Sequence, residues 1–266
     1  MTGVQTCALP ISAGVVPALI LTLCNLAAAY FVARSRGYPA GTFPGWHIVA
    51  RSLVAATPGL FVVVLIIVGI LSGVFTATES AAVAVLYALA LTVFVYRSLT
   101  WDQFVRAASK AVKTTGVVLL LIGISATFGY LISFYGVAEK TGELMASVST
   151  SPWAIFLMVN VILFVLGTFL DMAATILICT PIFLPICMQY GMGPVQFGMV
   201  MLLNCALGLN TPPVGTTQFV GCAIGGVSVG TVMRTIWPFY GALLAALALV
   251  TYVPAFSLWL PGVLLN

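Results

Sequence analysis

Two short stretches of the chain place helix-breaking residues beside oxygen-bearing side chains within apolar sequence. One is Gly-Thr-Phe-Leu-Asp at 167–171, and the other is Asn-Thr-Pro-Pro-Val-Gly at 210–215, with a further glycine at 208. Proline removes a backbone donor and disfavours helix in the residue before it, and glycine weakens a helix further. A bilayer tolerates irregular backbone only where it is buried in protein or lines a polar cavity. Both stretches are therefore candidate binding sites.

The chemistry expected at these breaks is the binding of a small cation together with an anion. Freed backbone carbonyls, hydroxyls and amides are hard oxygen ligands that suit Na⁺, and the exposed N-terminal ends of the following half-helices suit a carboxylate. If the two breaks meet near the middle of the membrane, one site holds both. We assign ion or substrate binding to Gly167, Thr168, Phe169, Asp171, Gly208, Asn210, Thr211, Pro212, Pro213 and Gly215. The predicted Na⁺ ligands among them are Gly167, Thr168, Gly208 and Thr211.

Two acidic residues lie in or beside apolar sequence, and each has more than one interpretation. Asp171 is the only acidic residue of the apolar run 152–188, and a buried carboxylate there needs a cation, a proton or the N-terminus of the helix that it begins. Glu79 stands at the head of the apolar run 80–96. It is either an N-terminal helix cap, with Thr76 or Thr78 as the capping hydroxyl, or a buried functional acid.

No set of residues predicts an enzyme. Aspartyl proteolysis needs paired aspartates, and only Asp171 lies in an apolar run, while a serine–histidine pair would depend on His47, the single histidine. The 6 cysteines show no CxxC or CxxH spacing, and five of them fall in apolar segments, as small core residues do. We expect no cofactor, with Na⁺ as a coupling ion.

Composition places the elements that position these residues in a membrane. Hydrophobic residues make up 62% of the chain and charged residues 5%, and the mean hydropathy is +1.21, beyond the range of a water-soluble domain. The apolar runs are mostly long enough to cross a hydrocarbon core of about 30 Å. The predicted fold class is an all-α polytopic membrane protein.

The few charges predict how the chain is threaded. Basic residues gather on one predicted face, in Arg34, Arg36, Arg51, Arg97, Arg106, Lys110, Lys113 and Arg234, whereas Lys140 lies on the other face beside Glu139 and Glu143. Positive loops mark the cytoplasmic side. The net charge of +4 therefore indicates membrane topology and not nucleic-acid binding.

The predicted segments run in order along the chain. They are a non-native start at 1–12, which resembles translated adapter sequence; a transmembrane helix at 13–33; a cytoplasmic or interfacial segment at 34–57; two transmembrane helices within 58–96; a cytoplasmic amphipathic helix at 97–115; a transmembrane helix at 116–137; a re-entrant hairpin at 152–189; a broken transmembrane helix at 194–227; and a transmembrane helix at 236–260. Two complete crossings at 152–189 give the same topology as the hairpin.

Five motifs carry a resemblance to a known family. They are Ala13–Pro17, Gly73–Val85, Leu166–Asp171, Pro181–Pro185 and Thr211–Gly215. In their order and spacing the chain resembles the DctM-like large permease subunit of the tripartite ATP-independent periplasmic (TRAP) transporters, from about Ala13 onward. The resemblance implies an elevator-type fold of two inverted repeats, each with a re-entrant hairpin and a broken helix. This chain matches the second repeat, so we expect the C-terminal portion of a large subunit.

The resemblance also implies a function and partners. It implies Na⁺-coupled secondary uptake of organic acids such as C4-dicarboxylates or sialic acid, across the bacterial inner membrane. The implied partners are a small DctQ-like membrane subunit, a DctP-like periplasmic solute-binding protein, the organic acid and the lipid bilayer, with no nucleic acid. The alternative is a non-transporting accessory or channel-like membrane subunit, for which unbroken helices are expected.

Overall fold

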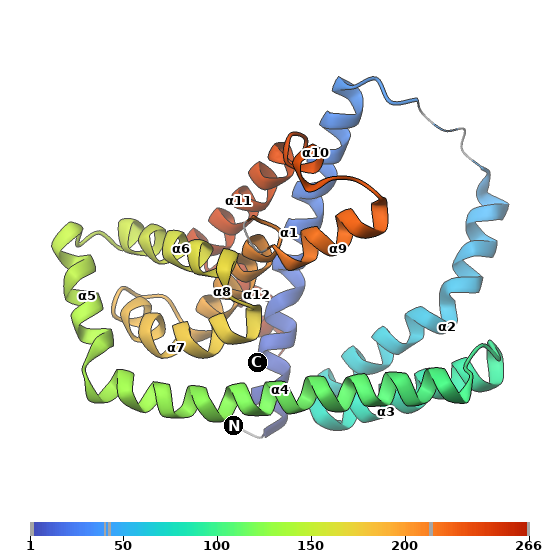
Figure 1. Ribbon diagram of the computed structural model, residues 1–266, viewed down its shortest axis with the longest axis horizontal. Coiled ribbons are helices and arrows are strands. Elements are labelled where there is room, and N and C mark those ends of the chain that lie inside the picture. Colours follow the sequence, from blue (N-terminus) through green and yellow to red (C-terminus); the bar gives the residue numbers. More distant parts are fainter. Residues whose placement is uncertain (1–2, 40, 42–43, 213–214, 265–266) are drawn as a thin grey trace. The chain divides into compact units, whose positions relative to one another are not determined.

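The computed structural model describes residues 3–39, 41, 44–212 and 215–264, and within these ranges the chain is helical with no strand (Figure 1). The elements are α1 (Gly3–Ser35), α2 (Trp46–Leu71), α3 (Ala77–Ala90), a π-helical turn η1 (Leu91–Val95), α4 (Trp101–Phe134), α5 (Val137–Val148), α6 (Pro152–Phe169), α7 (Met172–Gln189), α8 (Pro194–Leu209), α9 (Thr216–Gly225), α10 (Val229–Met233), α11 (Trp237–Tyr252) and α12 (Ala255–Leu264).

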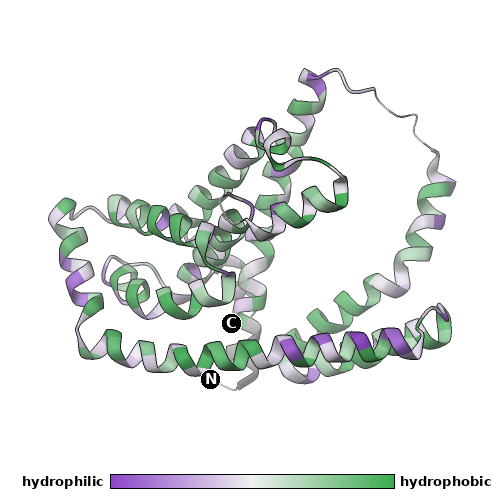
Figure 2. Cartoon of the chain, in the orientation of Figure 1, coloured by the Kyte–Doolittle hydropathy of each residue, from purple (hydrophilic) through white to green (hydrophobic). Residues whose placement is uncertain are grey.

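Most of these helices are of membrane-spanning type. Among the described residues, 6 helices are long and apolar enough to cross a bilayer, namely Leu9–Ser35 of α1, α2, α3 with η1, α4, α6 and α7. α11 and α12 make a seventh if the pair, bent by 60°, forms one span. Hydrophobic residues predominate along most of these helices in Figure 2, apart from one stretch of α4. Such a composition is typical of helices that lie in lipid or in a membrane-protein core. The all-α, multi-pass prediction is confirmed.

Several helices extend across the boundaries predicted from sequence. α1 is already helical at Gly3, before the predicted start at Ala13. α2 continues through Pro58, where we place the start of a span, because membrane helices tolerate an internal proline. α4 joins the predicted amphipathic helix 97–115 to the predicted span 116–137 without interruption, since one glycine, Gly116, weakens a long helix by only about 1 kcal/mol.

The described chain divides into two compact units, one of residues 3–11 and 37–114 and the other of residues 12–36 and 115–264. In the first unit α2 and α3 form a hairpin. The ring of Phe75 lies against Gly69, where an added Cβ would be 2.7 Å from Cδ2 of the ring. The hydroxyl of Tyr87 donates to the carbonyl of Pro58 at 3.1 Å. These contacts hold α3 beside α2.

The second unit has a continuous apolar core centred on α8. This helix packs against α6, α7, α11 and α12, and its residues Phe197, Val200 and Cys205 are at most 2% exposed. Ile155 and Leu163 of α6 are fully buried against the same core. Both predicted breaks belong to helices of this unit, so its packing decides how they meet.

Candidate functional site

The first predicted break is the junction of α6 and α7. α6 ends at Phe169, Leu170 has extended backbone angles, and α7 begins at Met172. Asp171 is the N-cap of α7, and its Oδ2 accepts a hydrogen bond from the Ala173 N–H at 3.2 Å. Each limb of this hairpin has 18 residues, or about 27 Å. That length allows both a re-entrant hairpin and two full crossings.

The second predicted break separates α8 from α9. α8 ends at Leu209 and α9 begins at Thr216, while Pro213 and Val214 lie outside the described residues. Gly215 closes the break with φ at +23°, and an added Cβ there would lie 2.9 Å from the carbonyl oxygen of Thr211. Only glycine fits that position without strain. The unwound segment predicted from the paired prolines is thus a gap between two helices.

The two breaks meet at a pair of glycines. A Cβ on Gly208 would lie 2.4 Å from the carbonyl carbon and 2.5 Å from the carbonyl oxygen of Gly167. Seen from the other side, a Cβ on Gly167 would lie 3.6 Å from the Cα of Gly208 and from the carbonyl oxygen of Asn204. Small residues allow membrane helices to approach at this distance. The tip of the hairpin therefore packs directly on the last turn of α8.

The hydroxyls predicted to ligate Na⁺ are turned back onto their own helices. Thr168 Oγ1 donates to the carbonyl of Val165 at 2.7 Å, and Thr211 Oγ1 donates to the carbonyl of Leu207 at 2.8 Å. A hydroxyl that donates its proton to a carbonyl keeps its oxygen lone pairs for another partner. Both hydroxyls are therefore oriented as acceptors, as a hard cation requires.

The remaining assigned residues differ in burial. Gly167, Thr168, Gly208 and Gly215 are buried, and Asn210, Thr211 and Pro212 are half-buried. Phe169 and Asp171 are exposed, so these two side chains take no part in the glycine contact. Of the interpretations predicted for Asp171, the structure shows the one in which it caps the N-terminus of α7.

Glu79 also has a capping role. Its Oε2 accepts hydrogen bonds from the backbone N–H and the hydroxyl of Thr76, both at 2.8 Å, and its own N–H donates to Thr76 Oγ1 at 3.3 Å. This reciprocal pair is a capping box at the start of α3. The side chain is exposed and lies in the first unit. The structure thus gives Glu79 a capping role within the first unit.

Sequence reasoning missed the contribution of α11 to the second break. The hydroxyl of Tyr240 donates to the carbonyl of Asn210 at 2.5 Å, and Tyr240 is 7% exposed. The amide of Asn210 donates to the carbonyl of Ala206 at 2.9 Å. A tyrosine in an apolar span has no sequence neighbour that reveals this partner, because the two residues are 30 positions apart.

A cavity of about 460 Å³ lies beside this tyrosine, within the size range of small-molecule sites. Its lining residues come from α1, α10, α11 and the junctions after α8 and before α11, and they are Asn25, Asn210, Val232, Thr235, Ile236, Phe239, Tyr240 and Leu243. The polar groups of this cavity are amides and hydroxyls. Asn25 and Thr235 also escaped the sequence prediction, since neither stands at a break.

A buried amide pair fixes α6 against α8. Asn204 Nδ2 donates to Asn160 Oδ1 at 2.6 Å and to the carbonyl of Val200 at 3.1 Å, and Asn160 Nδ2 donates to Thr251 Oγ1 at 3.1 Å. Because the Asn160 Oδ1 and the Val200 carbonyl oxygen are both acceptors, the atom of the Asn204 amide that faces them has to be the nitrogen and not the oxygen. Asn160 precedes Gly167 by two helical turns, and Asn204 precedes Gly208 by one. The pair therefore sets the register in which the glycines meet.

Comparison with known proteins agrees with the motifs. The profile of the family described as "Tripartite ATP-independent periplasmic transporter, DctM component" matches residues 1–256. The chain is 39% identical over 249 residues to an uncharacterized protein, YgiK, of Salmonella typhimurium, covering 94% of this chain and 57% of that protein. It is 37% identical over 253 residues to the C4-dicarboxylate TRAP transporter large permease protein DctM of Pseudomonas aeruginosa, covering 94% and 58%.

A third relative is the sialic acid TRAP transporter large permease protein SiaM of Vibrio cholerae. It is 34% identical over 254 residues, which cover 96% of this chain and 60% of SiaM. The chain therefore spans somewhat more than half the length of these relatives. Permease relatives fit the prediction that the chain is not an enzyme. Taken with the profile match, they show that this chain belongs to the DctM component family of the tripartite ATP-independent periplasmic transporters.

Proposed function

We propose that this chain supplies one half of the ion and substrate site of a permease that takes up organic acids together with Na⁺. The observation that carries the proposal is the backbone contact of Gly167 with Gly208, because it brings two helix breaks to one place. Transporters of several folds bind their ions and substrates at such breaks.

The proposed Na⁺ ligands are oxygens of both breaks. Thr168 and Thr211 contribute hydroxyl oxygens whose protons are already donated to helix carbonyls. Gly167 and Gly208 contribute carbonyl oxygens; that of Gly208 accepts the Thr211 N–H at 2.9 Å and has a second lone pair. Oxygen-only ligation suits a hard monovalent cation.

The proposed substrate is a carboxylate that lies between the break and the cavity at Tyr240. The break exposes the N-terminal end of α9, which attracts an anion. In the cavity, the amide of Asn25 has a second N–H beside the one that it donates to the carbonyl of Leu21. Two relatives are named for C4-dicarboxylate and for sialic acid, and both compounds carry a carboxylate. We infer an organic acid of this class for this chain.

Coupling follows from the shared position of the two ligands. A Na⁺ bound by Thr168 and Thr211 orders the tip of α6 and the end of α8 together, and the same segments present the anion site. By linkage, an ion that raises the affinity for the anion has its own affinity raised by the same factor. Na⁺ and the organic acid are therefore expected to bind cooperatively.

The proposal includes the assembly around the permease. A DctP-like periplasmic binding protein delivers the solute, and a small DctQ-like membrane subunit completes the permease. The permease lies in the bacterial inner membrane, with the basic loops in the cytoplasm. The hairpin α6–α7 is proposed to be re-entrant, as part of an inverted repeat that moves as an elevator. The competing function is a non-transporting accessory or channel-like subunit, which needs no ion site.

Binding of radioactive Na⁺ to the purified, reconstituted chain tests the proposal, with succinate and N-acetylneuraminate as probe anions. Thr211→Val removes a proposed ligand and is expected to weaken Na⁺ binding at least roughly tenfold, the loss of about 1.4 kcal/mol expected for one hydrogen-bonding or ion-ligating group. Thr180→Val is the matched control, because Thr180 Oγ1 also donates to the carbonyl four residues earlier and lies in α7 away from the breaks.

The two variants give a clear decision. Loss of Na⁺ binding in Thr211→Val alone supports the proposed ligands, and a Na⁺ dependence of probe binding supports coupling. Equal Na⁺ binding in both variants removes Thr211 from the site. A parent chain that binds neither Na⁺ nor either probe points to the accessory or channel-like function.

A further inference from the structure

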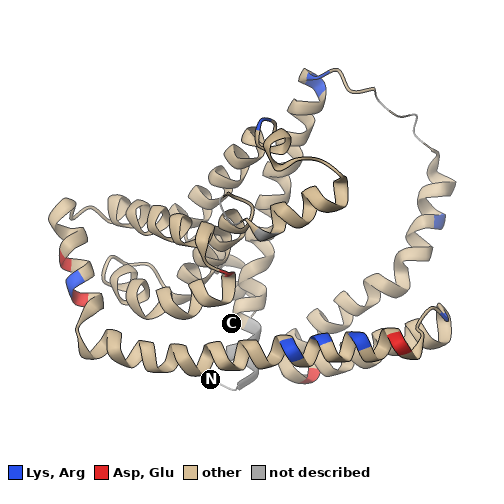
Figure 3. Cartoon of the chain, viewed as in Figure 1, with Lys and Arg blue, Asp and Glu red and all other residues tan. Residues whose placement is uncertain are grey.

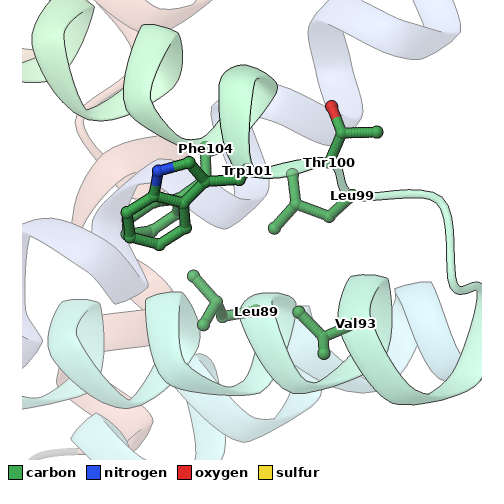
Figure 4. Close-up of a pocket in the computed structure, with 6 residues that line it drawn as sticks. All are labelled: Leu89, Val93, Leu99, Thr100, Trp101 and Phe104. Carbon is green, nitrogen blue, oxygen red and sulfur yellow. The ribbon is translucent and has the colours of Figure 1, made fainter.

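An apolar pocket lies in the first unit, where the end of α3 and η1 face the start of α4 (Figure 4). Its volume is about 190 Å³, and it is lined by Leu89, Val93, Leu99, Thr100, Trp101 and Phe104. The rings of Trp101 and Phe104 stack with centroids 5.5 Å apart, and Figure 4 shows them across the pocket from Leu89 and Val93. The pocket suits an aliphatic chain.

The one polar side chain of the pocket is already engaged. The hydroxyl of Thr100 accepts the Gln103 N–H at 3.4 Å, and the Gln103 side chain accepts the Thr100 N–H at 2.9 Å. This pair caps the first turn of α4. The lining therefore has few free hydrogen-bonding groups for a polar ligand, whereas its apolar surface remains accessible.

The length of α4 places the pocket at the membrane surface. The helix has 34 residues, or about 51 Å, against a hydrocarbon core of about 30 Å. All of its charged side chains lie between Asp102 and Lys113, so this end is the one that leaves the core. Trp101 is 77% exposed, as aromatic residues at the headgroup level commonly are.

Cations surround the pocket in sequence. Arg97 lies between the lining residues Val93 and Leu99, and Arg106, Lys110 and Lys113 follow on α4. Figure 3 shows lysine and arginine gathered along this part of α4 and at the loop before it. The single acid, Asp102, pairs with Arg106. Over the described ranges, Arg97, Lys110 and Lys113 form no ion pair. Basic clusters beside a membrane span attract anionic headgroups.

Arg97 also has an unusual backbone. Its φ is +48°, in the left-handed region that favours glycine, and no other non-glycine residue of the described chain has a positive φ. The turn is closed by the Ser98 N–H, which donates to the carbonyl of Thr92 at 3.1 Å. A glycine would adopt the same backbone conformation without strain. A residue held in such a conformation points to a role for its side chain.

We propose that this pocket binds one anionic phospholipid. An acyl chain lies against Leu89, Val93 and Trp101, and the phosphate is paired by Arg97 and the free lysines of α4. The apolar lining of the pocket and the basic residues near it in sequence favour this occupant over a soluble anion, which has no apolar part to fill the pocket. The lipid site is separate from ion and substrate binding and does not depend on the proposed transport function.

Fluorescence quenching by brominated lipid tests the site directly. A single-tryptophan chain keeps Trp101 and carries phenylalanine at the other tryptophans, Trp46, Trp153, Trp237 and Trp259. It is reconstituted in phosphatidylcholine vesicles with rising fractions of dibrominated phosphatidylglycerol or, separately, dibrominated phosphatidylcholine. If the site selects phosphatidylglycerol, half-maximal quenching is expected at a several-fold lower fraction of brominated phosphatidylglycerol than of brominated phosphatidylcholine. Each cation that pairs with the headgroup is expected to contribute a factor of roughly five.

Two variants separate the site from general surface charge. Arg97→Gln with Lys110→Gln is expected to abolish the selectivity, whereas Arg34→Gln with Arg51→Gln, which removes the same charge from the other basic segments, is expected to retain it. Retention of phosphatidylglycerol in native mass spectrometry of the parent chain and both double variants gives a second readout that needs no tryptophan replacement. Equal quenching by the two lipids, or selectivity that survives Arg97→Gln with Lys110→Gln, would overturn the proposal.

Discussion

Gly167 and Gly208 contact each other backbone to backbone at the point where the hairpin tip meets α8. The shortest distance from a Cβ built on Gly208 is 2.4 Å, to the carbonyl carbon of Gly167. Real Cβ atoms do not approach other atoms so closely. Since the obstacle is main chain and not a movable side chain, any residue larger than glycine at 208 has to displace one of the two helices.

Gly208→Ala is therefore expected to destabilise the second unit by about 1–3 kcal/mol, as overpacking of a filled core does, and to weaken Na⁺ binding if the proposed site is correct. The thermal unfolding midpoint in detergent measures the first effect. Gly198→Ala is the control on the same helix, because a Cβ there meets no atom within 4 Å, and it is expected to keep or raise the midpoint. A Gly208→Ala chain as stable as Gly198→Ala contradicts the close contact.

The amide pair Asn160–Asn204 is expected to behave as a coupled unit. Asn204→Leu leaves Asn160 Oδ1 without its donor at 2.6 Å and should lower the free energy of unfolding by about 1–3 kcal/mol. Asn160→Leu with Asn204→Leu removes both partners and should cost less than the sum of the single changes, by about 1 kcal/mol. Denaturant titrations in micelles provide the cycle. The control combines Asn160→Leu with Asn25→Leu. These two asparagines form no hydrogen bond with each other, so the losses in the free energy of unfolding should add.

Variants of Thr76 and Glu79 test whether Glu79 has a structural or a functional role. Thr76→Ala removes the capping hydroxyl of α3 and is expected to cost about 1 kcal/mol of stability, whereas Glu79→Gln preserves a capping box, in which glutamine also serves. Na⁺ binding should be unchanged in both. Thr57→Ala, which removes an exposed hydroxyl that bonds a carbonyl within α2, is the control for stability. Loss of Na⁺ binding in Glu79→Gln would restore the interpretation of Glu79 as a functional acid.

The two breaks were predictable because their causes are local, whereas their meeting was a condition that the sequence did not establish. Paired prolines and glycines inside apolar sequence interrupt a helix wherever it packs, and Gly208 stands one turn before the gap that Pro212 helps to open. The helix boundaries were less predictable. Pro58 remains inside α2, since whether a membrane helix continues past a proline depends on what packs around it and not on the proline alone.

The polar partners of the core were not predictable from sequence. Asn160, Asn204 and Thr251 each look like isolated polar residues in apolar runs, and their bonds join positions 44 and 91 residues apart. The same holds for Tyr240 and Asn210. Long-range hydrogen bonds follow from packing geometry, and no local pattern records them.

The hydroxyls of Thr168 and Thr211, which donate to carbonyls of their own helices, have a consequence for the energy source of transport. Neither these side chains nor the carbonyls of the neighbouring glycines gain or lose a proton in the physiological range. A proton therefore has no base among these ligands to which it can bind. If the four residues hold the coupling ion, the sodium gradient across the membrane can drive transport at this site, whereas protonation of these ligands cannot.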